Sequence, residues 1–237
     1  MGEKGNRIPE AQTENKIIRI DEDIYDVSRV IKSVCEIETK YGNGSGFLLK
    51  FINENNEIFF CLMTNEHVIT KKMIKNKEEI KISFDKTIQK PIILDDDIRF
   101  IKEFKDLDLD ITIVEIIEDD KIDGEYFLLP DMNIEKEKNN LINQEILIVQ
   151  FPNRNLSYSK GVIKEIEKYE LTYNPGTDKG SSGSPILLKS SQKIIGIINK
   201  DINLNKKITE IYFFLCFLLF LKMQIFDLKA LKSRLLT

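Results

Sequence analysis

Residues 176–188, GTDKGSSGSPILL, gather three glycines and three serines directly before an apolar run. A serine hydroxyl becomes a nucleophile only when a neighbouring base removes its proton, and a third group commonly orients that base. A glycine such as Gly180 adopts backbone conformations that other residues resist, so that consecutive N–H groups can point at one spot and stabilise an oxyanion. The stretch therefore predicts a catalytic loop with three candidate nucleophiles, Ser181, Ser182 and Ser184, against the alternative of an ordinary Gly/Ser loop.

The base would have to be His67, because it is the only histidine of the chain. It lies in TNEHVIT, directly after the apolar run EIFFCLMT at 57–64, where the end of a strand can project a side chain into a cleft. An isolated histidine is more commonly a surface or a satisfied core residue. A single histidine also excludes a zinc site built on paired histidine ligands, and we expect no metal and no cofactor.

A carboxylate for the third position comes from KDLDLDITIVEI, residues 105–116. Asp110 stands at the mouth of an alternating apolar strand, where an acid can be buried enough to hold an imidazole by its ring N–H. Asp110 is therefore the first choice and Asp108 the second. Asp106 is expected to be a solvated loop residue.

The elements that must position these residues are mostly β-strands. Short runs rich in Ile, Val and Phe alternate with Gly, Asn and Asp clusters, which is typical of a barrel or sandwich rather than of βα units. A tight turn is expected at 54–56. The predicted strands are 29–38, 45–52, 57–64, 80–84, 97–103, 110–116, 145–150, 157–166, 185–188 and 193–199.

Composition excludes several classes of partner. The net charge is −4 over 237 residues and no basic stripe stands out, so nucleic acid is not an expected partner. The polar first residues lack the apolar segment of a secretory signal, and three widely spaced cysteines predict reduced thiols in a cytoplasmic protein. The run IYFFLCFLLFL at 211–221 is too short to span a bilayer, which favours a final strand leading into a helix over a membrane anchor.

Taken together, three blocks of the sequence resemble the chymotrypsin/trypsin-like serine peptidases of the PA clan. The blocks are GSGFLLKF–FFCLMTNEHVI, DITIVEI, and NPGTDKGSSGSPIL followed by KIIGIIN. They occur in the order His, Asp, Ser, cover roughly residues 30 to 200, and are closest in style to the HtrA/DegP-like and glutamyl-endopeptidase-like branches. The resemblance implies two six-stranded antiparallel β-barrels with a C-terminal helix.

The same resemblance implies a role for each candidate residue. Ser182, the serine of G-x-S-G-x-P, would be the nucleophile, with Ser181 and Ser184 as bystanders. His67 would be the general base and then the general acid, oriented by Asp110. The backbone N–H groups of Gly180 and Ser182 would form the oxyanion hole.

Substrate contacts are implied on two further segments. Thr177 would form a wall of the specificity pocket, and the strand 194–199, with Ile197, Ile198 and Asn199, would pair with an extended polypeptide substrate. Glutamyl endopeptidases have a histidine where this chain has Ile198, so glutamate specificity is not expected. Trypsin and chymotrypsin have an acid where this chain has Ser181, so activation by cleavage of a precursor is not expected either.

The expected organisation follows the two barrels. Residues 1–26 would be a flexible arm, 27–130 the first barrel, 131–213 a linker and the second barrel, and 214–237 a helix. The predicted function is a serine endopeptidase. The alternatives are an inactive relative that binds peptides, and a protease attached to a membrane through 211–221.

Overall fold

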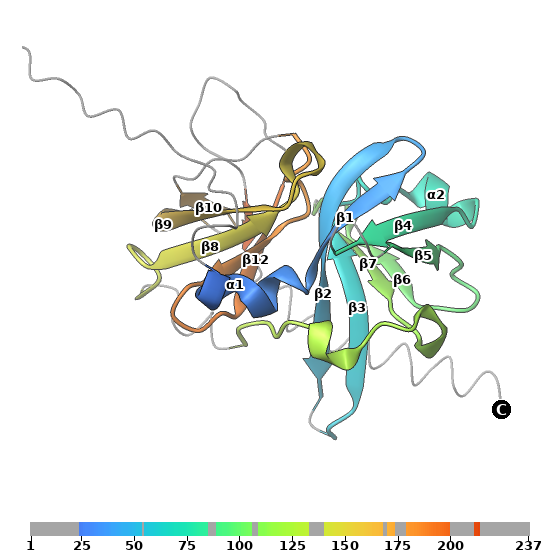
Figure 1. Cartoon of the computed structure of the whole chain (residues 1–237), viewed down its shortest axis with the longest axis horizontal. Coiled ribbons are helices and arrows are strands. Elements are labelled where there is room, and N and C mark those ends of the chain that lie inside the picture. The colour runs from blue at the N-terminus through green and yellow to red at the C-terminus, as the bar shows by residue number, and fades with distance from the viewer. Residues whose placement is uncertain are drawn as a thin grey trace, which may run out of the picture.

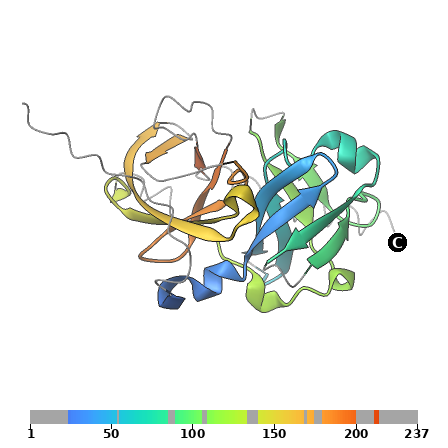
Figure 2. The ribbon, with the colours of Figure 1, turned by 45° about the horizontal axis from the view of Figure 1, so that its top comes forward.

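Two antiparallel β-sheets that lie side by side form the body of the protein (Figures 1 and 2). The computed structural model describes residues 24–53, 55–84, 89–105, 109–132, 140–167, 170–173, 179–199 and 211–213. Within these ranges nearly all regular structure is β-strand, and helices are short. The predicted double β-barrel is therefore confirmed. Residues 214–237, for which a helix was predicted, lie outside the described ranges, as do Cys216 and the first 23 residues.

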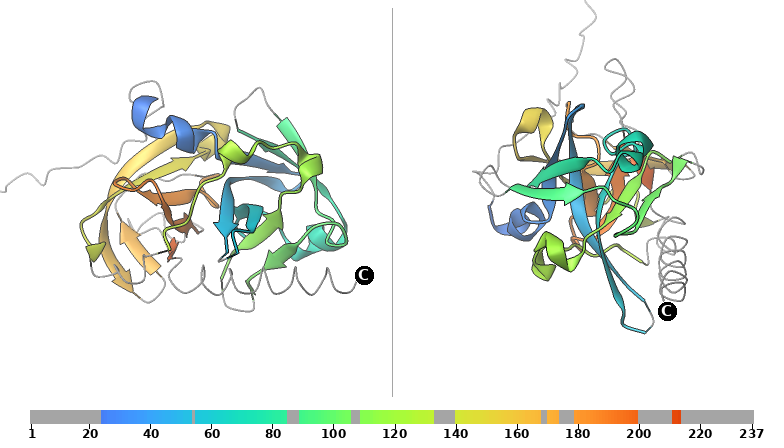
Figure 3. Two further views of the ribbon diagram at one scale, coloured as in Figure 1. Left: turned by 90° about the horizontal axis from the view of Figure 1, so that it is seen from below. Right: turned by 90° about the vertical axis from the view of Figure 1, so that its right-hand side faces the viewer.

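The first sheet is formed by strands β1 to β7, in the spatial order β5-β4-β1-β2-β3-β7-β6. Its β2–β3 hairpin extends beyond the rest of the sheet (Figures 1 and 3). The strands are β1 (Val34–Thr39), β2 (Gly42–Ile52), β3 (Ile58–Thr64), β4 (Glu79–Ser83), β5 (Gln89–Ile93), β6 (Ile101–Glu103) and β7 (Thr112–Glu115).

This sheet has seven strands where six were predicted. The strand missed in the sequence is β5, QKPII, because Pro91 argues against a strand interior. The structure explains the exception: β5 is an edge strand that pairs only with β4 among the described strands, with Pro91 opposite Lys81. A proline without an N–H is tolerated where one edge of the strand faces no partner.

The second sheet closes into a barrel in the order β10-β13-β12-β11-β8-β9. Here β10 was not predicted, and the predicted continuation after 193–199 is present as β13. The strands are β8 (Glu145–Gln150), β9 (Ser157–Glu167), β10 (Glu170–Tyr173), β11 (Pro185–Leu188), β12 (Ile194–Ile198) and β13 (Ile211–Phe213).

The first predicted strand, 29–38, is wrong in its first half. Residues Ile24–Ile31 form the helix α1, and β1 begins only at Val34. Val27 and Val30 lie three residues apart, on one side of a helix, and both are buried. The apolar spacing thus fits a helix that covers the outside of the second barrel (Figures 1 and 3).

Three apolar clusters organise the interior. One fills the first sheet, one fills the second barrel, and the third joins the two, since it contains Phe47 and Met63 from the first and Val149 and Leu187 from the second. Burial of this shared cluster stabilises the relative position of the two halves. Any site between the halves is therefore built on a packed interface.

The remaining elements are short. Helix α2 (Lys71–Lys75) follows β3, and single 3₁₀ turns occur at η3 (Glu118–Asp120), η4 (Gly124–Tyr126) and η6 (Pro152–Arg154). The predicted turn after β2 is present, with Asn53 N–H donating to Glu57 O at 3.1 Å.

Two of the three cysteines lie within the described residues. Cys35 and Cys61 are free and buried, as predicted, and burial raises the pKa of both. Among the described helices, none has the length and apolar character needed to cross a membrane.

Candidate active site

His67 and Asp110 are brought together by the pairing of β3 with β7. In this antiparallel pair Thr64, the last residue of β3, lies opposite Thr112, the first residue of β7. His67 follows three residues after Thr64, and Asp110 precedes Thr112 by two. The end of one strand and the start of the other therefore present a histidine and an acid at the same edge of the sheet.

Two hydrogen bonds join His67 to Asp110. The backbone N–H of His67 donates to Oδ1 at 2.9 Å, and the ring nitrogen Nδ1 lies 2.5 Å from Oδ2. The backbone of the acid is held as well, because Asn65 Nδ2 donates to Asp110 O at 2.7 Å. A carboxylate at Nδ1 selects the tautomer that carries its proton there, which leaves Nε2 free to accept one.

The pKa of Asp110 lies below its usual range. Burial of the carboxylate raises the pKa, but the hydrogen bond from the imidazole, the charge that His67 can carry, and the N–H groups of His67 and Glu66 outweigh burial. Asp110 is therefore ionised at neutral pH, and an ionised carboxylate stabilises a protonated imidazole beside it.

Ser182 lies in the loop before β11, and this loop packs against the end of β3. Gly183 has a φ of +87°, and a Cβ at this position would lie 2.1 Å from Ser45 O and 2.5 Å from Thr64 Oγ1. Only glycine fits such a close approach. Ser182 O also accepts a hydrogen bond of 2.9 Å from Ser45 N–H. These contacts place the serine loop beside the end of β3, and His67 follows β3 by three residues.

Ser182 is partly exposed. Between the described atoms of Ser182 and His67 no hydrogen bond is formed. Nucleophile and base commonly tighten their contact only when substrate is bound. Ser181 and Ser184, in contrast, are buried and do not present their side chains to solvent.

The carbonyl groups of Lys179 and Gly180, just before Ser182, accept hydrogen bonds from other parts of the chain. Gly180 has a φ of +98°, the Lys179 carbonyl accepts a hydrogen bond of 2.7 Å from Asn153 N–H, and the Gly180 carbonyl accepts one of 2.7 Å from Ser45 Oγ. In a trans peptide C=O and N–H point in opposite directions. Gly180 N–H is therefore directed away from Asn153. Within the described part of the chain, neither the Gly180 N–H nor the Ser182 N–H donates a hydrogen bond to a backbone carbonyl.

The predicted substrate strand needs one correction. Ile198 N–H donates to Ser184 O and Ile198 C=O accepts from Gly183 N–H, both at 2.9 Å, while Ile197 lies opposite Pro185 of β11 and Tyr212 of β13. The prediction that Ile197 and Ile198 pair with substrate is wrong, because strands on both sides of β12 already use this segment.

Of the other predicted site residues, Asn199 lies within the described part of the chain. Asn199 directly follows β12 and is buried, and among the described residues its Oδ1 has no hydrogen-bond partner. Thr177, Asp106 and Asp108 lie outside the described residues.

Sequence reasoning missed the residues that support the site. Ser45 donates its N–H to Ser182 O and its hydroxyl to Gly180 O in the serine loop. Asn65 holds the backbone of Asp110. Both lie in motifs quoted for other reasons, GSG and TNEH. Asn153 had no signal, because its contact with Lys179 joins distant parts of the chain.

Comparison with known protein families identifies the family of this chain. The trypsin-like peptidase domain matches residues 44–197, well over half of the chain. The chain belongs to the trypsin-like peptidases. No curated protein matches its sequence.

Solved structures similar to this trypsin-like peptidase share its fold at low sequence identity. Rv3671c of M. tuberculosis, in an inactive mutant form, is 13% identical over 84% of this chain and 89% of its own, with a TM-score of 0.56. The HtrA-type protease AlgW with a tripeptide is 14% identical over 85% and 62%, with a TM-score of 0.58. A serine endoprotease from Yersinia pestis is 17% identical over 79% and 61%, with a TM-score of 0.55.

Proposed function

We propose that this trypsin-like peptidase is a serine endopeptidase that cleaves polypeptides through Ser182, His67 and Asp110. The observation that carries the proposal is the pair of hydrogen bonds from His67 to a single carboxylate, that of Asp110. This arrangement orients a base in the tautomer that a serine nucleophile requires. Ser182 is the partly exposed serine of the adjacent loop, whereas its two serine neighbours are buried.

In the proposed reaction, Ser182 Oγ attacks the carbonyl carbon of the scissile peptide while its proton passes to His67 Nε2. The tetrahedral oxyanion accepts hydrogen bonds from the N–H groups of Gly180 and Ser182. The C–N bond then breaks, and the leaving amine takes the proton from the imidazolium, which Asp110 stabilises throughout. Water, deprotonated by the same imidazole, hydrolyses the acyl-enzyme and regenerates the Ser182 hydroxyl.

The proposed substrate is an extended polypeptide that contacts the segment after β12. The buried Asn199 Oδ1, without a partner among the described residues, supports a role for Asn199 as a hydrogen-bond acceptor for substrate. Thr177 remains the proposed wall of the specificity pocket. The buried free thiols Cys35 and Cys61 are compatible with a reducing compartment, and we propose the cytoplasm.

Hydrolysis of fluorescently labelled casein tests the proposal. We expect wild-type protein to release fluorescent peptides, and Ser182→Ala, His67→Ala and Asp110→Asn each to lower the rate by about 10⁴-fold. Ser190→Ala, an exposed serine in the turn after β11, is the matched control and should keep full activity. Casein hydrolysis that survives Ser182→Ala would contradict the proposed nucleophile.

The competing function is a peptide-binding protein without turnover. It is favoured by one observation, that Ser182 and His67 are not hydrogen-bonded to each other. Binding of a fluorescent peptide by folded wild-type protein, with neither hydrolysis nor an acylated serine detected by mass spectrometry, would establish this alternative in place of the endopeptidase.

A further inference from the structure

The loop between β8 and β9 holds two consecutive non-glycine residues in a left-handed conformation. Asn153 has a φ of 50° and Arg154 a φ of 66°. Side chains disfavour this region, so such residues persist only where surrounding contacts determine the backbone. Two local bonds contribute, from Arg154 N–H to Phe151 O at 3.2 Å and from Asn155 N–H to Pro152 O at 3.0 Å.

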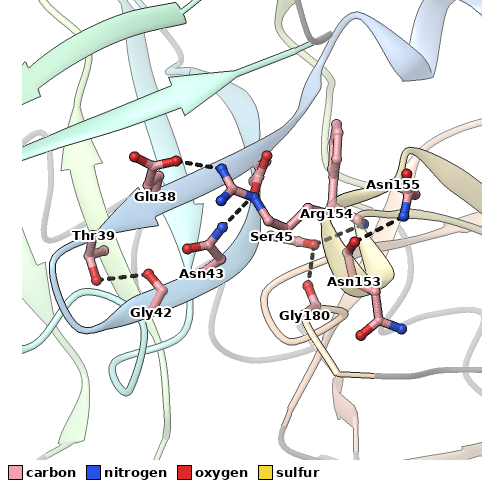
Figure 4. Close-up of polar contacts among 11 residues, drawn as sticks. Glu38, Thr39, Gly42, Asn43, Ser45, Asn153, Arg154, Asn155 and Gly180 are labelled. Carbon is pink, nitrogen blue, oxygen red and sulfur yellow. Dashed lines mark hydrogen bonds and ion pairs between the residues drawn. The ribbon is translucent and has the colours of Figure 1, made fainter.

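A further restraint comes from the other half of the molecule. The guanidinium of Arg154 extends to β1, where Nε donates to Glu36 Oε1 at 2.7 Å. Its Nη2 donates to Glu38 Oε2 on the same strand (Figure 4). Glu36 is itself steadied by Asn43 Nδ2. These three groups form what we call the Arg154 clamp, defined as Arg154, Glu36 and Glu38.

The clamp and Ser45 share one face of the β1–β2 hairpin. In the strand register Glu36 lies opposite Ser45 and Glu38 lies opposite Asn43, and directly opposite residues of an antiparallel pair project to the same side. One hairpin face therefore contacts the second barrel twice. It contacts Arg154 through carboxylates and Gly180 through the Ser45 hydroxyl (Figure 4).

The loop held by the clamp is the loop that orients the peptide before Gly180. Asn153 N–H, adjacent to Arg154, donates to Lys179 O at 2.7 Å. Rotation of the Lys179–Gly180 peptide would break this bond and turn Gly180 N–H by the same angle. A Cβ on Gly180 would lie 2.7 Å from Phe151 O, so the two loops are in direct contact.

We propose that the Arg154 clamp is a positioning element that fixes the Lys179–Gly180 peptide through Asn153 and so holds the oxyanion-binding N–H in place. The role of Gly180 N–H rests on the proposed function, whereas the mechanical link from Arg154 to Lys179 does not. The clamp acts through the loop and touches no substrate.

The clamp is suited to act locally. Arg154 is 58% exposed, and exposed ion pairs contribute little to global stability and are screened by salt. Its carboxylates differ in exposure, 12% for Glu36 and 37% for Glu38. We therefore expect its loss to loosen the loop without unfolding the protein.

Amide hydrogen exchange resolved by residue tests the link directly. Arg154→Met keeps most of the side-chain length and removes the charge. We expect the Asn153 N–H to exchange roughly two- to fivefold faster, with Leu62 N–H in the core unchanged. Glu36→Gln alters no residue of the loop and should act in the same direction. Lys189→Met, which removes the exposed Lys189–Glu145 ion pair, is the matched control and should leave Asn153 unchanged.

Kinetics provide the second readout. Loss of one oxyanion donor costs about 10²–10³ in kcat, so its partial displacement in Arg154→Met should lower kcat for a peptide substrate on the order of tenfold, with KM within about twofold. The double variant Arg154→Met/Glu36→Gln should lose no more than Arg154→Met alone.

The two proposals fail in different ways. Unchanged Asn153 exchange in both single variants would overturn the clamp, and so would a kcat equal to that of wild type. A wild-type protein that hydrolyses nothing would overturn the endopeptidase, while Asn153 exchange would still decide whether the clamp exists.

Discussion

The hydroxyl of Ser45 is the most informative single group to remove, because it joins the two halves of the protein. It is fully buried, donates to Gly180 O at 2.7 Å and accepts from Phe151 N–H at 3.1 Å. In Ser45→Ala the buried Phe151 N–H would be left unsatisfied, which costs about 1–3 kcal/mol. Gly180 is partly exposed, so water can replace its lost bond at a cost of about 1 kcal/mol or less. We expect the free energy of unfolding to fall by about 1–4 kcal/mol.

Urea unfolding followed by circular dichroism measures this change, with the m-value unchanged if only the folded state is affected. Ser159→Ala is the matched control, because Ser159 is also buried but its Oγ has no hydrogen-bond partner among the described residues. That variant should be neutral or slightly more stable. A loss in Ser45→Ala below about 0.5 kcal/mol, or no larger than in Ser159→Ala, would refute the assignment of Ser45 as a bridge.

Two further predictions concern the backbone and the acid of the site. Gly183→Ala should abolish casein hydrolysis and destabilise the fold, because its Cβ would lie 2.1 Å from the Ser45 carbonyl oxygen. Gly42 also has a positive φ, but a Cβ there would have no atom within 4 Å. Gly42→Ala should therefore keep its activity, which isolates the effect of the clash at Gly183. The Asp110 pKa lies below its ordinary value of 3.8, so its ionised form stabilises the fold above about pH 4 and this stabilisation is lost as the pH falls through the folded-state pKa. The unfolding free energies of wild type and Asp110→Asn should therefore converge as urea titrations are taken below about pH 4. A difference that grows below about pH 4 would contradict this sign.

The parts of the fold that could be predicted are those with local signals. A continuous apolar run marked β3 and an alternating one marked β7. His67 and Asp110, which lie just beyond the ends of these strands, fall at one sheet edge once the strands pair. The glycines of the serine loop indicated that its backbone adopts conformations reserved for glycine. The φ values of +98° at Gly180 and +87° at Gly183 agree with this.

The parts that could not be predicted depend on distant pairings. Ser45 and Gly180 are 135 residues apart, and Arg154 and Glu36 are 118 apart, so no local pattern links them. Pro91 could be accepted in a strand only after β5 was known to be an edge. The substrate role expected for Ile198 failed for the same reason, since strand partners on both sides are visible only in the folded barrel.

The most direct test of the central claim is the site of covalent labelling by a fluorophosphonate probe. Trypsin digestion of the labelled, folded protein yields the peptide from Gly180 to Lys189, in which fragmentation mass spectrometry distinguishes Ser182 from Ser181 and Ser184. We predict one phosphonylated residue, Ser182, with labelling abolished in Ser182→Ala. No labelling of folded wild-type protein, or a label on either neighbouring serine, would contradict the account.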